Sequence, residues 1–502
     1  MENQTFHVQE KHPLLKLPAW KTVFAWQNIL TYALTLCVLI GVFYTISPRR
    51  EEALLRFVLT PISFGALALI AYNCEYLKFP EVKLMGAFFL WMIFATLLVD
   101  WQIDGPLSSN WACAVCVTTF LCFSAPYAFS RDQLRRTLRW VCTAAVIASF
   151  VLCATALLLV ATGKIVVSSG GGELFGMGAD GRLHLFCNPN TTGPLAALPM
   201  LLAVILLASA KKRITRIALL VAMAVFYVTL ALSDSRTATY GVAAALGLCM
   251  FLYGNMKAPG KTRRWVRILT SAVAGIAVMV MLMYGTRLVA GAYNTYAQAH
   301  EKEWTADIAA QGDEETGSIQ DGAGIQAIKR GSYGASSFNG RTDIWEIAVK
   351  YLCNNPKILL HGVGALDAGP TISPYMPDYL PKANFHNSFF SVLFAFGLPG
   401  LLLVLAFCVF LAIAAVKLMF CRLTDRNSLE ARLIPTVLVY MVVEVMLEEF
   451  LFTGTTLNPI WTWFSLCAGM TFCFLRKEAA DDKPCAAKVA TCDAAMYNEQ
   501  IN

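Results

Sequence analysis

A histidine stands at the start of a long apolar run, in the sequence NFHNSFF (384–390). A neutral imidazole can take a proton from a hydroxyl group near neutral pH, so that the oxygen becomes a better nucleophile. We therefore predict His386 as a catalytic base, with Asn387 or a nearby glutamate orienting the ring. A lone histidine here could also be an interfacial or core residue without chemistry, so the choice depends on the charges around it.

Two arginines occupy positions where positive charge is uncommon. Arg236 lies in LSDSRTA (232–238), at the start of an apolar block, and Arg341 begins an amphipathic segment. A guanidinium group binds phosphate through two parallel hydrogen bonds. Arg236 could instead reach lipid headgroups, and Arg341 could be a solvated surface residue. A cation at a helix N-terminus is unfavourable unless an anion binds there, which favours a binding role for Arg341.

Carboxylates lie inside an apolar block near the end of the chain. Glu444 and Glu448 share one helix face in VVEVMLEEFLF (442–452), since they are four residues apart. A carboxylate at bilayer depth costs about 2.5–3.5 kcal/mol, so it indicates a functional site, with Arg236 or Arg341 as the natural partner of Glu444. The outermost glutamates could also reach interfacial water. Imidazole, guanidinium and carboxylate together describe transfer onto a hydroxyl from a phosphate-linked donor.

The composition places these residues in a membrane protein. Of the 502 residues, 57% are hydrophobic and 15% are charged, whereas a soluble protein carries about 25% charged residues. The apolar residues form blocks of about 20, the length that spans a bilayer as a helix. We predict an all-α polytopic membrane protein with about 12 transmembrane helices, over residues 24–45, 54–73, 84–103, 109–127, 138–162, 189–209, 214–232, 236–255, 266–284, 387–416, 433–451 and 459–475.

The basic residues orient this bundle, because Lys and Arg favour the cytoplasmic side. Basic connections alternate with connections that carry almost no positive charge, and SPRR (47–50) is an exception. Both termini are therefore predicted to be cytoplasmic, and His386 lies at the outer face. Membrane orientation and anionic lipids account for the net charge of +7, so no nucleic-acid partner is expected. The basic segments are 131–139, 211–216, 257–267 and 417–432.

One outward connection is far longer than the others. Its acidic, Gly- and Ser-rich part, 300–340, predicts an irregular segment, and 340–356 predicts an amphipathic helix that ends at Pro356. The next run is interrupted by FGLPG (396–400), which predicts a short helix, a kink and a cavity next to His386. The predicted parts are a cytoplasmic segment 1–23, nine helices in 24–284, an extracytoplasmic loop with short helices 285–385, three helices in 386–475 and a cytoplasmic tail 476–502.

Three motifs in this order resemble the bacterial O-antigen ligase and O-antigen polymerase superfamily. LSDSRTA resembles the family's Ser-Arg at the end of a span. GRTDIWEIAVKYLCNNPKILLHGVGA (340–365) resembles its Arg-x-x-x-Trp helix followed by Pro and a Gly-x-Gly turn. FHNSFFSVLFAFGLPGLLL (385–403) resembles its His-Asn followed by a Gly-x-x-Gly break. The motifs span about 235–405, and the helix layout with one large late loop is similar to that of the family.

The resemblance implies a metal-independent glycosyltransferase without a cofactor. Its donor is a polyprenyl-diphosphate-linked glycan, such as one carried on undecaprenyl diphosphate, and its acceptor is a sugar, lipid or polymer. The place of reaction is the outer face of the bacterial cytoplasmic membrane, and the product is a surface polysaccharide. Arg236 and Arg341 match the arginines that hold the donor diphosphate, and His386 matches the proposed base. Asn387, Glu444 and Glu448 are predicted to support them. The Pro-rich link before His386 and the acidic segment depart from the family and leave the acceptor open.

A secondary transporter or exporter is the main alternative, because twelve spans is a common number for carriers. Carriers often consist of two matching halves with interrupted helices at corresponding positions. The long loop here follows the ninth span and only one break stands out, which argues against two halves. A passive scaffold or sensor would leave the charged residues unexplained. The outward cysteines Cys187 and Cys353 give no sign of whether they pair.

Overall fold

The structure is a computed structural model, and it describes part of the chain. The predicted cytoplasmic segment 1–23, most of the acidic segment 300–340 and nearly all of the tail 476–502 lie outside the described residues. The described ranges are 25–43, 55–103, 107–167, 174–178, 181–185, 187, 189–256, 264–310, 319–321, 341–364, 371–375, 385–420, 429–448 and 460–477.

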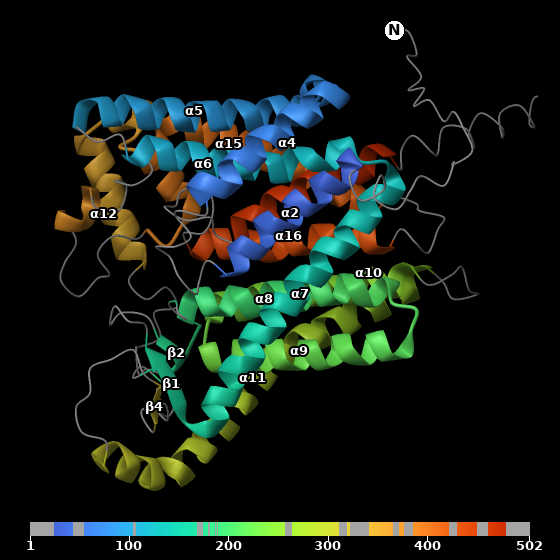
Figure 1. The fold of residues 1–502 in the computed structure, drawn as a ribbon, viewed down its shortest axis with the longest axis vertical. Helices are drawn as coiled ribbons and strands as arrows, with labels where there is room; N and C mark the ends of the chain where they lie inside the picture. The colour runs from blue at the N-terminus through green and yellow to red at the C-terminus, as the bar shows by residue number, and fades with distance from the viewer. Residues whose placement is uncertain are drawn as a thin grey trace, which may run out of the picture.

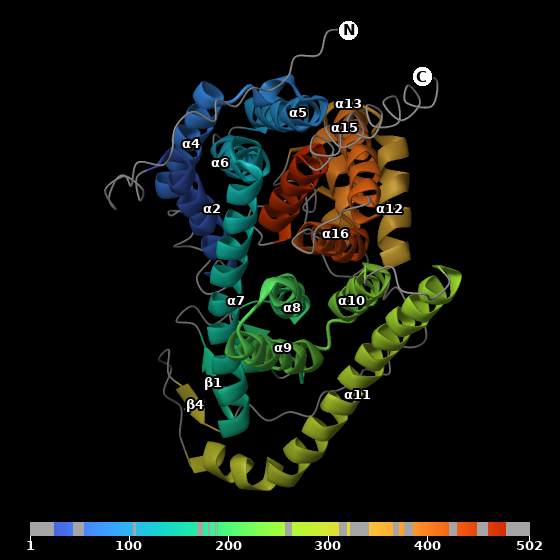
Figure 2. The same ribbon diagram turned by 90° about the vertical axis from the view of Figure 1, so that its right-hand side faces the viewer.

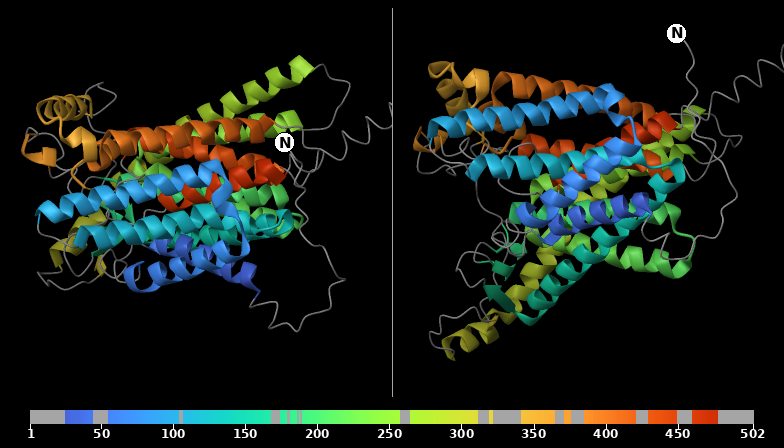
Figure 3. Two further views of the ribbon diagram at one scale, coloured as in Figure 1. Left: turned by 90° about the horizontal axis from the view of Figure 1, so that it is seen from above. Right: turned by 45° about the horizontal axis from the view of Figure 1, so that its top comes forward.

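Each of the twelve predicted apolar blocks coincides with a helix in the described part of the chain, and most of these helices run side by side (Figure 1; Figure 3). They are α2 (Trp26–Phe43), α4 (Thr60–Asn73), α5 (Pro80–Ile103), α6 (Leu107–Ser124), α7 (Arg131–Thr162), α8 (Pro189–Ser209), α9 (Arg213–Ser233), α10 (Arg236–Met256), α11 (Arg264–Ala310), α15 (Ser388–Phe420), α16 (Leu429–Leu447) and a last helix over 460–477.

Seven of these helices are long and apolar enough to cross a membrane, within the described residues. They are α5, α7, α8, α9, α10, α11 and α15, and shorter apolar helices cover Trp26–Val42, Phe57–Asn73 and Cys113–Ala128. The prediction of a polytopic membrane protein is confirmed. The number of twelve spans and the cytoplasmic location of both termini stay predictions.

A small antiparallel sheet departs from the all-α prediction. Its strands are β1 (Lys164–Val167), β2 (Leu174–Met177), β3 (Leu183–Leu185) and β4 (Ile319–Asp321), in the order β3-β2-β1-β4. Each strand has only three or four residues, too few for an alternating pattern to stand out in the sequence. Ile165 is paired with Gln320, so the sheet joins the connection after α7 to a segment that follows α11.

Helix α11 is much longer than the predicted span over 266–284. It continues to Ala310, so residues 285–310, which begin the predicted loop, are helical. Figure 2 shows α11 steeply inclined to the other helices, along the outside of the bundle. Only 11% of its most apolar window is buried in the protein, so most of this helix faces the surroundings, as expected for a helix in contact with lipid.

The amphipathic helix predicted at 340–356 is present as α12 (Arg341–Asn354). Its buried side chains are those of Ile344, Ala348 and Leu352, at the predicted helical spacing. On its exposed face Lys350 donates a hydrogen bond of 2.6 Å to Glu346, which lowers the pKa of that carboxyl. Two short elements follow, α13 (Ile358–His361) and the 3₁₀ helix η5 (Ser373–Tyr375).

The predicted break in α15 is confirmed, and it lies at Gly397, with φ 66° and ψ −173°. Protein groups satisfy the carbonyls that the break releases: Val363 N donates to Phe394 O (2.8 Å), Gly364 N to Ala395 O (3.0 Å) and Trp91 Nε1 to Phe396 O (2.7 Å). The HGVG segment (361–364) at the end of α13 therefore packs into the break, and the cavity next to His386 stays a prediction.

Replacing Gly362 with alanine is expected to destabilise the protein by at least about 2 kcal/mol. Gly362 has φ +77°, and a Cβ there would overlap the backbone of Ala395. With ψ −164° this is a conformation found essentially only at glycine, and it costs another residue about 1–3 kcal/mol. Forced overlap typically adds about 1–3 kcal/mol. The measurement is the thermal midpoint of the purified protein in detergent.

Gly291→Ala is the matched control, because a Cβ at Gly291 meets no atom within 4 Å. Alanine favours the helical state over glycine by up to about 1 kcal/mol, so this variant should melt at the same or a higher temperature. Equal melting temperatures for Gly362→Ala and the parent protein would contradict the role of the turn.

Helix α16 lies against α10 and α15 and sets which helix ends meet. A Cβ on Gly241 in α10 would lie 2.9 Å from the ring of Tyr440, and Cys249 Sγ donates to Thr436 Oγ1 at 3.1 Å. Higher numbers on α10 thus pair with lower numbers on α16, so the two helices are antiparallel. The start of α10, at Arg236, therefore lies at the same end of the bundle as the end of α16.

Candidate functional site

Three segments that are distant in sequence meet at the carboxylate of Glu448, one residue past the end of α16. Arg341 Nη2, at the start of α12, donates to Glu448 Oε1 at 2.6 Å. His386 Nδ1 lies 3.0 Å from Glu448 Oε2. The exposed fractions of these side chains are 5% for Glu448, 13% for Arg341 and 16% for His386. We call Arg341, His386 and Glu448 the charged triad.

The contact with Glu448 selects the tautomer of a neutral imidazole. A carboxylate accepts hydrogen bonds, so the proton of a neutral His386 ring is on Nδ1. The lone pair is then on Nε2, which becomes the basic nitrogen of the ring. This is the arrangement that a general base requires, with one nitrogen oriented by a carboxylate and the other able to take a proton.

The backbone at His386 is strained and is held from both sides. His386 has φ +48°, which is uncommon for a residue other than glycine and costs about 1–3 kcal/mol. On one side Trp345 Nε1 donates to Phe385 O at 2.8 Å, and the Phe385 ring is buried against Phe394 with centroids 4.6 Å apart. On the other side Asn387 caps the next helix. Backbone strain is often stored at functional sites, and here it points the ring toward Glu448.

The side chain of Asn387 forms hydrogen bonds with backbone groups, whereas the ring of His386 is oriented by Glu448. Asn387 Oδ1 accepts hydrogen bonds from the amides of Phe389 (2.9 Å) and Phe390 (3.2 Å), which is an N-cap for α15. Its Nδ2 donates to Met446 O at 3.1 Å. Ser388 Oγ also donates to Glu448 O at 3.0 Å. These bonds attach the start of α15 to the end of α16 and so fix the position of His386 relative to Glu448.

Glu444 is buried, but no arginine in the described part of the chain pairs with it. Its Oε1 accepts a hydrogen bond from Tyr440 OH at 2.9 Å, and Arg341 pairs with Glu448 instead. The expectation that Glu444 would have an arginine as its partner is therefore wrong. Arg341 pairs with Glu448 because Glu448 lies one turn farther along the chain, beyond the end of α16, where the chain can approach α12.

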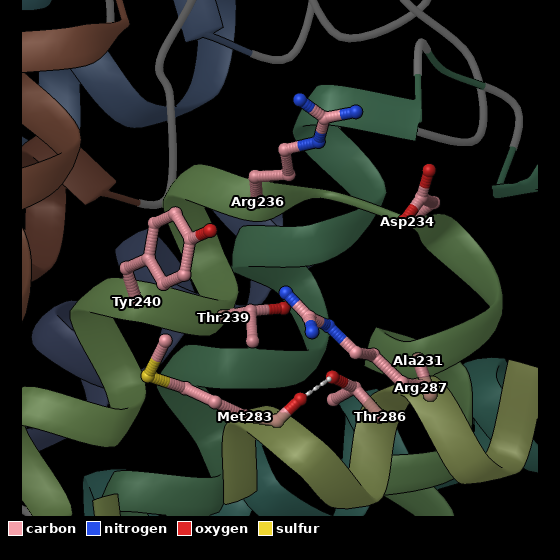
Figure 4. A pocket seen from close by; sticks show the side chains of 8 residues that line it. All are labelled: Ala231, Asp234, Arg236, Thr239, Tyr240, Met283, Thr286 and Arg287. Carbon is pink, nitrogen blue, oxygen red and sulfur yellow. Dashed lines mark hydrogen bonds between the residues drawn. The ribbon is translucent and has the colours of Figure 1, made fainter. Parts of the chain in front are cut away.

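Arg236 is separate from the charged triad and lines a cavity of about 280 Å³ (Figure 4). Arg236 is exposed, and no ion-pair partner of it is present in the described part of the chain. The antiparallel packing of α10 on α16 places this cavity and the charged triad at one end of the bundle. The cavity is lined by Ala231, Asp234, Arg236, Thr239, Tyr240, Met283, Thr286 and Arg287.

The sequence analysis does not identify two residues that the structure brings to the end of the bundle with the cavity and the charged triad. Arg287 falls in the predicted loop 285–385, but it lies on α11 and lines the cavity together with Arg236. The continued apolar pattern after residue 284 was the signal for a longer helix. Trp345 enters the sequence prediction only through the Arg-x-x-x-Trp motif. Its ring is stacked on that of Phe390, with centroids 5.8 Å apart.

The outward cysteines and the remaining acidic residues show no arrangement that suggests chemistry in the described part of the chain. Cys187 and Cys353 do not form a disulfide with each other, and Cys187 Sγ lies 3.5 Å from Thr192 Oγ1. Within the ranges that the structure describes, no three side chains of His, Cys, Asp or Glu are grouped closely enough to hold a metal ion. At the opposite end of α16, Glu430 accepts hydrogen bonds from Arg139 and ties α16 to α7.

Comparison with known proteins gives a family-model match over the part of the chain that holds most of the site. Residues 218–405 match the family model described as O-antigen ligase. This range contains Arg236, Arg341 and His386, and Glu448 lies beyond it. A search of curated proteins gives no match. The resemblance carried by the three motifs is thus confirmed over residues 218–405.

Proposed function

We propose, from the O-antigen ligase domain over residues 218–405, that this membrane protein transfers a glycan from a polyprenyl-diphosphate carrier to an acceptor hydroxyl. The reaction takes place at the outer face of the bacterial cytoplasmic membrane, in the synthesis of an O-antigen-like, capsular or extracellular polysaccharide. The observation that carries the proposal is the charged triad, in which one buried carboxylate contacts both an arginine and a histidine.

In the proposed reaction, the acceptor oxygen forms a bond with the anomeric carbon of the donor sugar. The bond between that carbon and the phosphate oxygen breaks, and the polyprenyl diphosphate leaves with the bonding electron pair. His386 Nε2 takes the proton of the acceptor hydroxyl. Glu448 stabilises the imidazolium that forms, because its carboxylate accepts the hydrogen bond from Nδ1.

Arginines bind the donor and stabilise the leaving group, whose negative charge increases as the bond breaks. Arg236 offers its guanidinium to the diphosphate from the start of α10. Arg341 uses Nη2 for Glu448, so its other N–H groups are the ones proposed to reach a phosphate oxygen. Arg341 then links donor binding to the position of the base through the shared carboxylate.

The acceptor separates a ligase from a polymerase, which use the same donor chemistry. We favour a polymerase or a general surface-polysaccharide transferase, because no feature of the chain points to a lipid A core as acceptor. The two activities leave different intermediates when the protein is lost, since a polymerase carries out chain growth and a ligase acts after it.

The test is the mass of polyprenyl-diphosphate-linked glycans in cells that lack the protein. Accumulated single repeat units would identify a polymerase, and accumulated long polymer still attached to its lipid would identify a ligase. A lipid-linked pool equal to that of the parent strain would contradict glycan transfer and favour the secondary transporter. Cells complemented with the parent gene serve as the control.

A further inference from the structure

Arg287 on α11 lines the same cavity as Arg236, and its guanidinium points toward Thr239 (Figure 4). We propose that Arg287 is a donor-binding residue that completes the phosphate site together with Arg236. This inference rests on the proposed function and adds to it a residue outside all three motifs. Its first basis is the geometry of α10 and α11.

A pair of glycines lets the backbones of the two helices come into contact. A Cβ on Gly247 would lie 2.8 Å from the carbonyl oxygen of Gly275, and a Cβ on Gly275 would lie 2.6 Å from that of Gly247. Arg236 lies 11 residues before Gly247, and Arg287 lies 12 residues after Gly275. At about 1.5 Å per residue, both arginines are roughly 17 Å from the crossing and at the same end of the bundle. Because α11 is inclined to α10, the helices separate there and leave the cavity.

Charge is the second basis. Neither Arg236 nor Arg287 has an ion-pair partner among the described residues, whereas Arg341 is paired with Glu448. Arg236 and Arg341 carry two positive charges, and their acidic neighbours Asp234 and Glu448 carry two negative charges, so this set has a formal charge of zero. A neutral set would attract a diphosphate poorly. Arg287 brings the formal charge to +1 and supplies a second guanidinium without an acidic partner.

The surroundings of Arg287 indicate a ligand with an anionic head and an apolar tail. The guanidinium lies 5.5 Å from the ring centroid of Tyr284, which is 61% exposed, and Leu288 is 75% exposed. These side chains belong to the face of α11 that packs against little of the protein. Thr239 and Tyr240 add hydroxyl groups to the cavity wall. A polyprenyl diphosphate would place its phosphates between the arginines and its tail along α11.

An anionic headgroup of an ordinary phospholipid has similar chemistry, so the test must separate the two ligands. The full-length protein is placed in nanodiscs of phosphatidylcholine, and the dissociation constants of undecaprenyl diphosphate and undecaprenyl monophosphate are measured. Phosphatidylglycerol is then added as a competitor. We expect the protein to prefer the diphosphate, and phosphatidylglycerol at the same concentration should not displace it.

The variant Arg287→Gln should bind undecaprenyl diphosphate at least about tenfold more weakly, since it loses a charge-assisted hydrogen bond. Arg287→Lys should show a smaller loss, because a point charge replaces a planar fork. Lys350→Gln is the matched control, since it removes one exposed positive charge from α12 outside the cavity. His386→Ala should leave this affinity within about twofold. In turnover, Arg287→Gln should raise KM for the donor more than it lowers kcat.

The outcomes separate the two proposals. If the parent protein does not bind undecaprenyl diphosphate, the proposed function fails and this inference fails with it. If the parent binds it and Arg287→Gln binds equally well, only the role of Arg287 is overturned. Displacement of undecaprenyl diphosphate by phosphatidylglycerol at the same concentration would also overturn the role of Arg287, since Arg287 would then contact bulk lipid. Should Arg287→Gln not fold, Arg287→Lys decides, and unchanged affinity in that variant overturns the role.

Discussion

Replacing His386 with alanine is expected to lower kcat for glycan transfer by a factor of about 10² to 10⁴, the usual contribution of a general base. The reason is that Nε2 is the nitrogen left to take the acceptor proton when Nδ1 is bound to Glu448. Donor affinity should stay within about twofold of the parent value, because the arginines are unchanged. The measurements are turnover of a purified lipid-linked donor and direct binding of undecaprenyl diphosphate.

A second substitution separates the lost base from a disturbed backbone. His386 has φ +48°, a conformation that asparagine tolerates better than alanine. His386→Asn should therefore fold as well as the parent protein and still lack a base, so its kcat should fall as far as that of His386→Ala. Near-normal turnover in His386→Asn would show that the histidine is not the base.

Replacing Glu448 with glutamine should damage both activity and stability. Breaking a buried ion pair by removing one partner typically costs about 3–5 kcal/mol, and Arg341 is only 13% exposed. Glutamine has a single acceptor oxygen, whereas the carboxylate serves Arg341 with one oxygen and His386 with the other. We expect a lower thermal midpoint and a fall in kcat of about 10² or more, by analogy with loss of the carboxylate that orients a catalytic histidine.

Glu444→Gln is the matched control, on the same helix face one turn earlier. A glutamine at this position can still accept the hydrogen bond from Tyr440, and neither His386 nor Arg341 hydrogen-bonds to Glu444. Its kcat should therefore stay within a few-fold of the parent value. A larger loss in Glu444→Gln than in Glu448→Gln would contradict the assignment of Glu448 as the residue that positions the base.

The helices and the helix break of this protein can be predicted directly from the amino-acid sequence. Apolar blocks predict the helices, because the length and hydropathy of a segment determine whether it can span a bilayer. The spacing of Ile344, Ala348 and Leu352 predicts α12, and the glycines and proline of FGLPG predict the break at Gly397. These features depend on neighbours along the chain, so a pattern of a few residues is sufficient to reveal them.

The sequence also indicates which residues are functional, because a charged residue in an apolar segment is costly and therefore stands out. Arg236, Arg341 and His386 stand out in this way and fall in the range that matches the O-antigen ligase family model. Charge alone does not show which groups touch. Glu444 and Glu448 look equivalent on a helical wheel, and only the end of α16 at Leu447 lets the second one reach both Arg341 and His386.

Contacts between distant segments depend on how whole surfaces pack, and no local pattern encodes them. The pairing of β1 with β4 joins residues about 150 positions apart. The cavity shared by Arg236 and Arg287 exists because α10 and α11 cross at Gly247 and Gly275 and then separate. The types of residue in the site can therefore be predicted from sequence, whereas their partners follow from the packing of α10, α11, α12 and α16 against one another.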